Sequence, residues 1–254
     1  WHNAGRRVIH SGKRGFGTEQ IGGEFNTGGS QRIYRKKQFF PGVLYMDKDL
    51  NTNSKLKITE EYSEKYKKYV EFLKNRLTPK RFIHSLCVAD EAVRLAIKYN
   101  CNTEKAFLAG LLHDCCKDID AKEQLQLFER FGIMLNTIES KAPKLWHAIA
   151  GAEYINTELD IKDKDILAAV RYHTTARKGM SLLEKIIYLA DFTSADRDYD
   201  GVSDMRKAVT KDLDTAMFEA LDFSVKDLEN KGLPVHSDTM EAYAEIAERL
   251  GKEI

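Results

Sequence analysis

The chain has 254 residues, 40 of them Lys or Arg and 39 Asp or Glu, so its length allows one substantial core with an appendage and its net charge is close to zero. Of its four cysteines, Cys115 and Cys116 are neighbours and Cys87 and Cys101 fall in helical sequence, which disfavours a disulfide framework, and the lack of a Cys-x-x-Cys pair argues against a cysteine-based zinc site. There is no secretory signal, and no run approaches the roughly 18 apolar residues of a membrane span, so we expect a soluble, cytoplasmic protein without a membrane partner.

The first segment of the chain is basic and rich in glycine. Residues 1–45 hold nine of the 16 glycines and eight Lys or Arg against two acids, which leaves 32 basic and 37 acidic residues elsewhere, a net charge of −5. The composition favours a mobile arm, and Gly22-Gly23 and Gly28-Gly29 lack the Gly-Lys-Ser/Thr of a phosphate loop. We assign residues 1–57 to this arm and a linker, either flexible or an artefact of the gene model. Because the main body is mildly acidic, we expect no nucleic-acid partner.

Residues 58–254 predict an all-α domain. Apolar residues recur there at spacings of three and four, with no alternating strand pattern of useful length. Thr78-Pro79 is typical of a helix start, and Ser181 with Glu184 forms a capping-box pattern. The predicted helices cover residues 60–77, 79–99, 103–112, 123–131, 144–159, 162–172, 181–191, 212–231 and 238–250.

An adjacent His-Asp pair follows the most apolar of these helices. His113 and Asp114 come directly after the predicted helix 103–112. Imidazole and carboxylate together suit a metal such as zinc, manganese or iron. The dipeptide alone is a weak signal, because a hydrogen-bonded histidine at a capped helix end gives the same pattern.

Other potential ligands also fall at helix ends. His84, His147 and His173 lie at or near the ends of their predicted helices, and Asp191 closes the apolar helix 181–191. A helical bundle can direct several helix ends toward one pocket. The shared position of these residues predicts one metal centre.

The order His84, His113-Asp114, Asp191 resembles the H…HD…D pattern of the HD-domain metal phosphohydrolases. The resemblance extends over about residues 62–250 to the bacterial YqeK-type family. It rests on residues 80–86, 111–117, 171–177, 179–191, 197–202 and 231–239, and His-Thr-Thr-x-Arg followed by Gly-Met-Ser-Leu-Leu-Glu-Lys is its most specific part. Two departures are Ala176, where glycine is usual, and Thr193-Ser194-Ala195 before Arg197.

The resemblance implies an HD-domain helical bundle that hydrolyses diadenosine tetraphosphate to two ADP, by attack of metal-bound hydroxide on an inner phosphate. It implies iron as cofactor, one or two ions, with manganese or another divalent metal left open. The implied metal ligands are His84, His113, Asp114 and Asp191. His147 and His173 would complete a second metal site or contact substrate phosphates.

Cations suited to a polyphosphate accompany these ligands. Asp114 and Lys117 are the catalytic candidates. The substrate-binding candidates are Arg81, Lys117, His147, His173, Thr174, Arg177 and Arg197. The alternatives are a solvated surface charge for the arginines, a helix cap for Thr174, and a capping role rather than catalysis for Glu184.

Two other functions remain open from the sequence. One is another HD-superfamily nucleotidase or phosphodiesterase, and the other is a non-hydrolytic, iron-binding helical protein. The phosphate-suited cations weigh against the second, and the missing Gly-Tyr-Pro element disfavours a cyclic-dinucleotide phosphodiesterase of the HD-GYP kind. The preference for adenine over guanine and the oligomeric state, including a homodimer, also stay open.

Overall fold

The computed structural model describes residues 52–254, with side chains from residue 59 onward, and every regular element there is a helix, as predicted. The predicted arm, residues 1–45, and the linker as far as residue 51 lie outside the described residues. None of the described helices is long and apolar enough to cross a membrane. The helices are α1 (Thr52–Lys65), α2 (Lys67–Arg76), α3 (Pro79–Lys98), α4 (Thr103–Leu112), α5 (Ala121–Phe131), α6 (Thr137–Lys141), the 3-10 turn η1 (Pro143–Leu145), α7 (Trp146–Thr157), α8 (Lys164–Tyr172), α9 (Leu182–Thr193), α10 (Val202–Lys211), α11 (Leu213–Asn230) and α12 (Ser237–Leu250).

Local capping chemistry sets the helix starts that matter for the site. Thr78 caps α3, with its hydroxyl accepting from the Arg81 N–H and proline at the first helical position. Ser181 and Glu184 form the predicted capping box at the start of α9. The sequence therefore predicted both starts correctly.

Three features differ from the sequence prediction. The predicted helix 60–77 is interrupted at Tyr66, whose φ of −107° and ψ of 27° separate α1 from α2. Helix α1 begins at Thr52, inside the predicted linker. Helices α6 and α10 were not predicted; α6 has only five residues, and its start depends on a capping box formed by Asn136 and Glu139.

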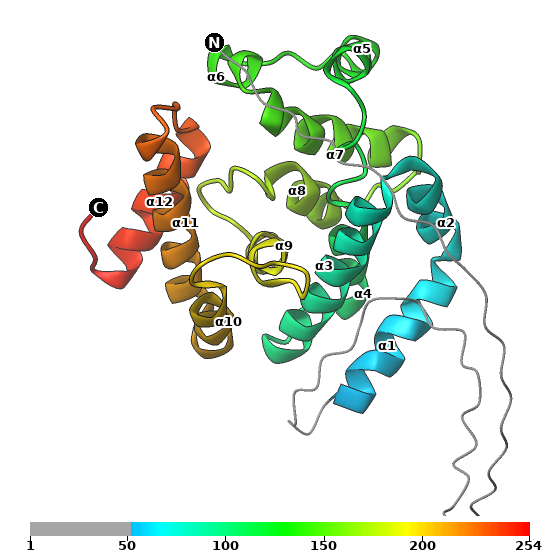
Figure 1. The fold of residues 1–254 in the computed structure, drawn as a ribbon, viewed down its shortest axis with the longest axis horizontal. Coiled ribbons are helices and arrows are strands. Elements are labelled where there is room, and N and C mark those ends of the chain that lie inside the picture. Colours follow the sequence, from blue (N-terminus) through cyan, green and yellow to red (C-terminus); the bar gives the residue numbers. More distant parts are fainter. Residues whose placement is uncertain (1–51) are drawn as a thin grey trace, which may run out of the picture. The chain divides into compact units, whose positions relative to one another are not determined.

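Helix α4 is the centre of the bundle. All of its residues from Ala106 to Leu112 are buried, and it packs against α3, α8 and α9 (Figure 1). A helix that is apolar on all sides belongs in the interior. Its C-terminal end therefore delivers His113 and Asp114 into the middle of the fold.

Gly110 allows α4 to lie close to α3, and we expect Gly110→Ala to destabilise the protein. A Cβ at this position would lie 2.9 Å from the Ala89 Cα, a backbone atom that has no rotamer by which to move away. Overpacking of this kind costs about 1–3 kcal/mol, and each kcal/mol lowers the melting temperature of a domain of this size by about 2–4 °C.

The matched control is Gly151→Ala in α7, where the added Cβ would meet the Cys115 Sγ at 3.4 Å, an ordinary contact. Since alanine favours a helix over glycine by about 1 kcal/mol, this variant should melt at or above the wild-type temperature. Thermal melts followed by circular dichroism compare the two. A Gly110→Ala protein as stable as the control would show that the two helices can separate freely.

Candidate metal centre

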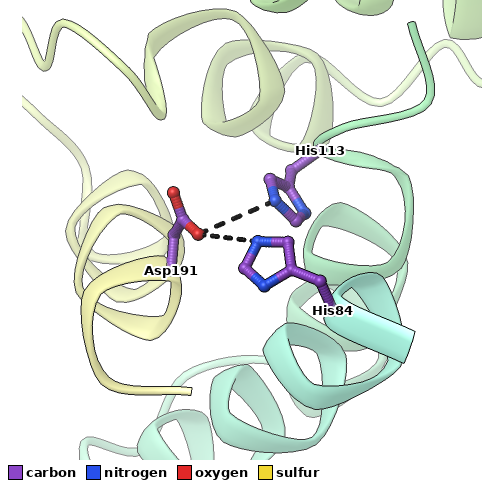
Figure 2. Close-up of side chains that lie close together, drawn as sticks. All are labelled: His84, His113 and Asp191. Atoms are coloured by element: carbon purple, nitrogen blue, oxygen red, sulfur yellow. Dashed lines mark ion pairs between the residues drawn. The ribbon is translucent and has the colours of Figure 1, made fainter. Parts of the chain in front are cut away.

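Three helices bring His84, His113 and Asp191 together. His84 lies in the second turn of α3, His113 directly follows α4, and Asp191 lies in the last turn of α9. The Asp191 Oδ1 is 3.0 Å from the His84 Nε2 and 3.9 Å from the His113 Nε2 (Figure 2). Residues far apart in the sequence thus direct their ligand atoms toward one point.

Asp114 joins this group to the two remaining histidines. Its Oδ1 is 3.1 Å from the His147 Nε2 and 3.5 Å from the His173 Nε2, while its Oδ2 is 3.4 Å from the His113 Nε2. The four histidines and Asp114 are buried, and the Asp191 side chain is 19% exposed. The structure therefore gathers all six predicted metal-ligating residues into one cluster.

Hydrogen bonds on the outer side of two rings determine which nitrogen faces inward. The Nδ1–H of His113 donates to the Gly110 carbonyl, and that of His173 donates to the Val170 carbonyl, each over 2.7 Å. Each ring therefore directs its Nε2 toward the cluster. The buried His113 Nε2 has no hydrogen-bond partner, which is costly unless another group satisfies it. A bound cation would provide that partner.

The ligand atoms form two groups that can each hold an ion. One consists of His84, His113 and Asp191, and the other of His113, Asp114 and His173, with the ligand atoms of each group within 4.8 Å of one another. Mixed imidazole and carboxylate ligands suit iron, manganese and zinc. The residues present therefore fit a divalent metal.

Burial and neighbouring groups shift the pKa values of Asp114, His113 and His147. Burial opposes ionisation of Asp114, but His113, His147 and His173 outweigh it and hold the pKa of Asp114 well below its usual range. Burial lowers the pKa of His113, and it lowers the pKa of His147 to about 4.

His84 differs from these histidines. Burial would lower the pKa of His84, but hydrogen bonds to Asp191 and Asp196 outweigh it and raise the pKa to about 9. An ion that binds His84 would displace a proton from it, so we expect metal binding to strengthen as the pH rises toward 9.

Three of the predicted cations contact the cluster. Arg81 places Nη1 2.7 Å from the Asp114 Oδ2, and Arg197 forms an ion pair with Asp191. The Lys117 Nζ is 3.2 Å from both ring nitrogens of His147, and burial lowers the pKa of Lys117. Positive charge therefore borders both ligand carboxylates.

The structure places Arg177 and Thr174 differently. The Arg177 guanidinium donates from Nε and Nη2 to both oxygens of Glu184, over 2.5 and 2.9 Å, which links it to the capping box of α9. The Thr174 hydroxyl is buried without a hydrogen-bond partner. Ala176, which departs from the glycine usual in this motif, adopts a left-handed conformation with φ of 56°, the region glycine favours. Substrate binding by Arg177 and Thr174 stays a prediction.

Sequence reasoning missed Asp196. Its Oδ2 accepts a hydrogen bond from the His84 Nδ1 over 2.8 Å, and this contact spans 112 positions of the chain. His84 also helps to lower the pKa of Asp196, to about 2, against the effect of burial. The sequence offers one weak signal for Asp196, which is its position directly before Arg197 in a charged loop.

The chain is similar to known proteins of one family. The family model described as "HD domain" matches residues 81–196, a range that contains His84, His113, Asp114 and Asp191. Proteins named "Bis(5'-nucleosyl)-tetraphosphatase, symmetrical" are similar to the chain. The one from Bacillus subtilis is 36% identical over 67% of this chain and 91% of its own length, and the one from Staphylococcus aureus is 34% identical over 66% and 87%.

A solved structure shares the fold. It is described as a predicted HD superfamily hydrolase involved in NAD metabolism, from Clostridium acetobutylicum. The match has a TM-score of 0.70 and 40% sequence identity, and covers 72% of this chain and 97% of that one. The likeness thus extends over most of this chain.

Proposed function

The chain belongs to the HD-domain family of symmetrical bis(5'-nucleosyl)-tetraphosphatases, and from this premise we propose that it hydrolyses diadenosine tetraphosphate to two ADP. The observation that carries the proposal is the convergence of His84, His113, Asp114 and Asp191 on one cluster. This is the pattern on which the resemblance to the family rests.

The test is product identification with the purified protein and diadenosine tetraphosphate. Symmetrical cleavage breaks the central P–O–P bond, so water adds to one inner phosphorus and both products are ADP. Chromatography should show ADP as the only nucleotide product. Formation of AMP and ATP would contradict the proposal.

We assign the metal to His84, His113, Asp114 and Asp191, and iron to the site, with manganese as the alternative that the same ligands accept. These residues would hold a divalent ion, which would lower the pKa of a water and so supply a nucleophile at neutral pH. The two ligand groups share His113, which supports a single ion or a closely spaced pair. Elemental analysis of the purified protein measures which metal is bound, iron or manganese, and whether each chain holds one ion or two.

The surrounding cations would stabilise the charge that develops on phosphate oxygens during hydrolysis. The side chains of Arg81 and Arg197 are 29% and 36% exposed, so phosphate oxygens can contact them. Lys117 lies beside His147 and would neutralise charge on the departing ADP. We assign Asp114 and Lys117 to catalysis. We assign phosphate binding to the remaining candidates, which are Arg81, Arg177, Arg197, His147, His173 and Thr174.

Arg197→Lys is expected to keep the metal and lose activity on the tetraphosphate. Arg197 pairs with Asp191 beside the cluster, and its guanidinium can bind phosphate oxygens through two parallel hydrogen bonds, which lysine cannot reproduce. Loss of one charge-assisted contact costs about 2–3 kcal/mol, or roughly 30- to 150-fold in rate. Steady-state rates and the metal content of the variant provide the measurement.

Two comparisons sharpen this experiment. p-Nitrophenyl phosphate has no distal phosphates, so its hydrolysis should fall much less than that of the tetraphosphate. Arg249→Lys, in α12, alters an exposed ion pair with Asp214 and should leave both rates unchanged. The same pair of substrates tests Arg177→Lys, for which equal losses on both would indicate a structural role through Glu184.

A further inference from the structure

The histidines of the cluster obtain their outer hydrogen bonds in two different ways. His113 and His173 each follow the last residue of a helix and donate to a carbonyl three positions earlier. The last four carbonyls of a helix have no hydrogen-bond partner within it, so the helix itself leaves these two carbonyls available as acceptors. The orientation of both rings is therefore set by their own helices.

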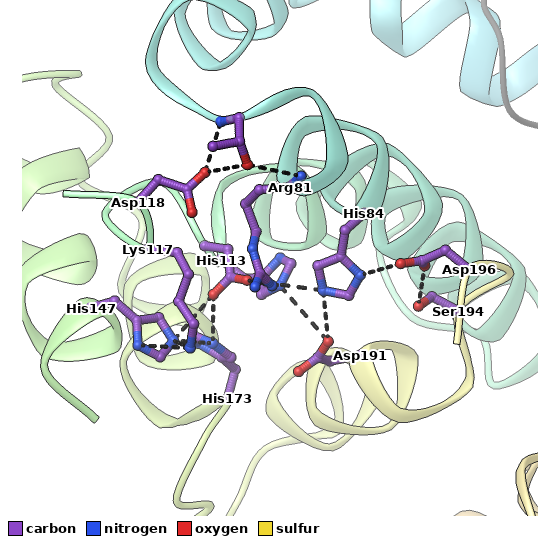
Figure 3. A network of polar contacts seen from close by, with 12 residues as sticks. Arg81, His84, His113, Lys117, Asp118, His147, His173, Asp191, Ser194 and Asp196 are labelled. Carbon is purple, nitrogen blue, oxygen red and sulfur yellow. Dashed lines mark hydrogen bonds and ion pairs between the residues drawn. The ribbon is translucent and has the colours of Figure 1, made fainter. Parts of the chain in front are cut away.

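His84 has no such acceptor nearby. It lies in the second turn of the 20-residue helix α3, where the preceding carbonyls bond to amides of the helix itself. Its Nδ1 donates instead to the Asp196 Oδ2 over 2.8 Å, across 112 positions of the chain (Figure 3). The Nε2 then faces Asp191 at 3.0 Å. The orientation of this ring depends on a distant loop.

That loop holds Asp196 in place. The Ser194 hydroxyl donates to the Asp196 Oδ1 over 2.8 Å, which leaves Oδ2 for His84. Arg206 of α10 donates to three backbone carbonyls of the same turn, those of Thr193, Ser194 and Arg197, over 3.0, 2.7 and 2.9 Å. The carboxylate is therefore fixed by a side chain and by an anchored backbone.

We propose that Asp196 is a positioning residue of the metal centre, whose carboxylate fixes the His84 ring with Nδ1 protonated and Nε2 directed at the ion. This rests on the metal site proposed above. A carboxylate that accepts from a ligand histidine fixes its tautomer and strengthens its donation to the metal, and removing such a partner lowers metal affinity by about 10- to 100-fold. Ser194, in the stretch 193–195 that departs from the family pattern, supports this contact.

The test measures Mn²⁺ binding to the full-length protein, first stripped of metal, by isothermal titration calorimetry. Asp196→Ala should bind Mn²⁺ about 10- to 100-fold more weakly than wild type. Asp196→Asn keeps an oxygen that can accept from the His84 Nδ1 but loses the negative charge. Its affinity for Mn²⁺ should therefore lie between those of wild type and Asp196→Ala. Asp198→Asn is the matched control, an exposed carboxylate in the same loop, and should bind as wild type does.

A second readout separates positioning from a general structural role. Tetraphosphate hydrolysis by Asp196→Ala should require more Mn²⁺ for half-maximal activity, while its kcat at saturating Mn²⁺ approaches the wild-type value. Circular dichroism verifies that each variant is folded, and Ser194→Ala, which leaves the carboxylate intact, should show a smaller shift in the same direction.

Asp196→Ala binding Mn²⁺ within twofold of wild type would overturn the proposal, as would an equal loss in Asp198→Asn. A wild-type protein that binds no Mn²⁺ and no iron would instead overturn the metal site itself. The two failures are therefore distinguishable.

Discussion

Asp114→Ala is expected to remove nearly all hydrolysis of diadenosine tetraphosphate while the helical fold survives. The Asp114 carboxylate lies within 3.5 Å of ligand nitrogens on His113, His147 and His173, and it pairs with Arg81. No other carboxylate of the described residues lies as close to all three rings. We expect a loss on the order of 10³-fold or more, which corresponds to about 4 kcal/mol of transition-state stabilisation.

The matched control for this variant is Asp118→Ala. Asp118 also accepts two strong hydrogen bonds, from the backbone N–H and the hydroxyl of Thr78 over 2.7 and 2.8 Å, but it lies outside the ligand groups. Its replacement should cost about 1–2 kcal/mol of stability and leave the hydrolysis rate nearly unchanged. If Asp114→Ala hydrolysed the tetraphosphate at close to the wild-type rate, the His113-Asp114 pair would have no role in catalysis.

His113→Ala should behave as Asp114→Ala does. His113 belongs to both ligand groups, and its Nε2 is the buried atom that lacks a hydrogen-bond partner. Loss of the His113 side chain should therefore lower the metal affinity of both ligand groups. Circular dichroism should show unchanged helix content, because the alanine extends a segment that already has helical geometry at φ −53° and ψ −39°.

Exhaustive chelation is expected to abolish activity and lower the melting temperature. An ion that binds only the folded bundle stabilises it by mass action, by about 2.7 kcal/mol when its free concentration is 100 times its Kd. For a domain of this size, that corresponds to a fall of roughly 5–10 °C on removal of the metal. Calorimetry before and after chelation, with metal analysis of both samples, provides the measurement.

Two controls accompany the chelation experiment. Restoring Mn²⁺ or Fe²⁺ should recover both activity and melting temperature, which excludes irreversible damage. Asp114→Ala, with one ligand removed, should show a much smaller change in melting temperature on chelation. Full turnover by metal-free protein would refute a metal mechanism for this site.

The sequence predicted the elements that depend on neighbouring residues. Apolar periodicity identified most of the helices, and Thr78-Pro79 and the Ser181–Glu184 box identified two of their starts. Local bonding decides these features, and so residue order reveals them. The comparisons confirm the family and the all-α HD-domain fold that the motifs indicated.

The motif spacing also identified the residues that the structure gathers at the cluster. His84, His113, Asp114 and Asp191 each lie on or beside an apolar helix, and a buried polar group at such a position needs a partner. Sequence alone could therefore propose that they meet. Their roles as metal ligands stay predictions, which the chelation and alanine experiments test.

Only the tertiary structure decided which side chains pair. Spacing along a helix indicates a face, but it does not state how helices cross or which loop reaches which ring. Arg177 thus pairs with Glu184 on α9, and His84 receives its outer partner, Asp196, from a loop 112 positions away. The contact between His84 and Asp196 depends on the packing of α3 against α9, which the order of residues in either helix does not specify.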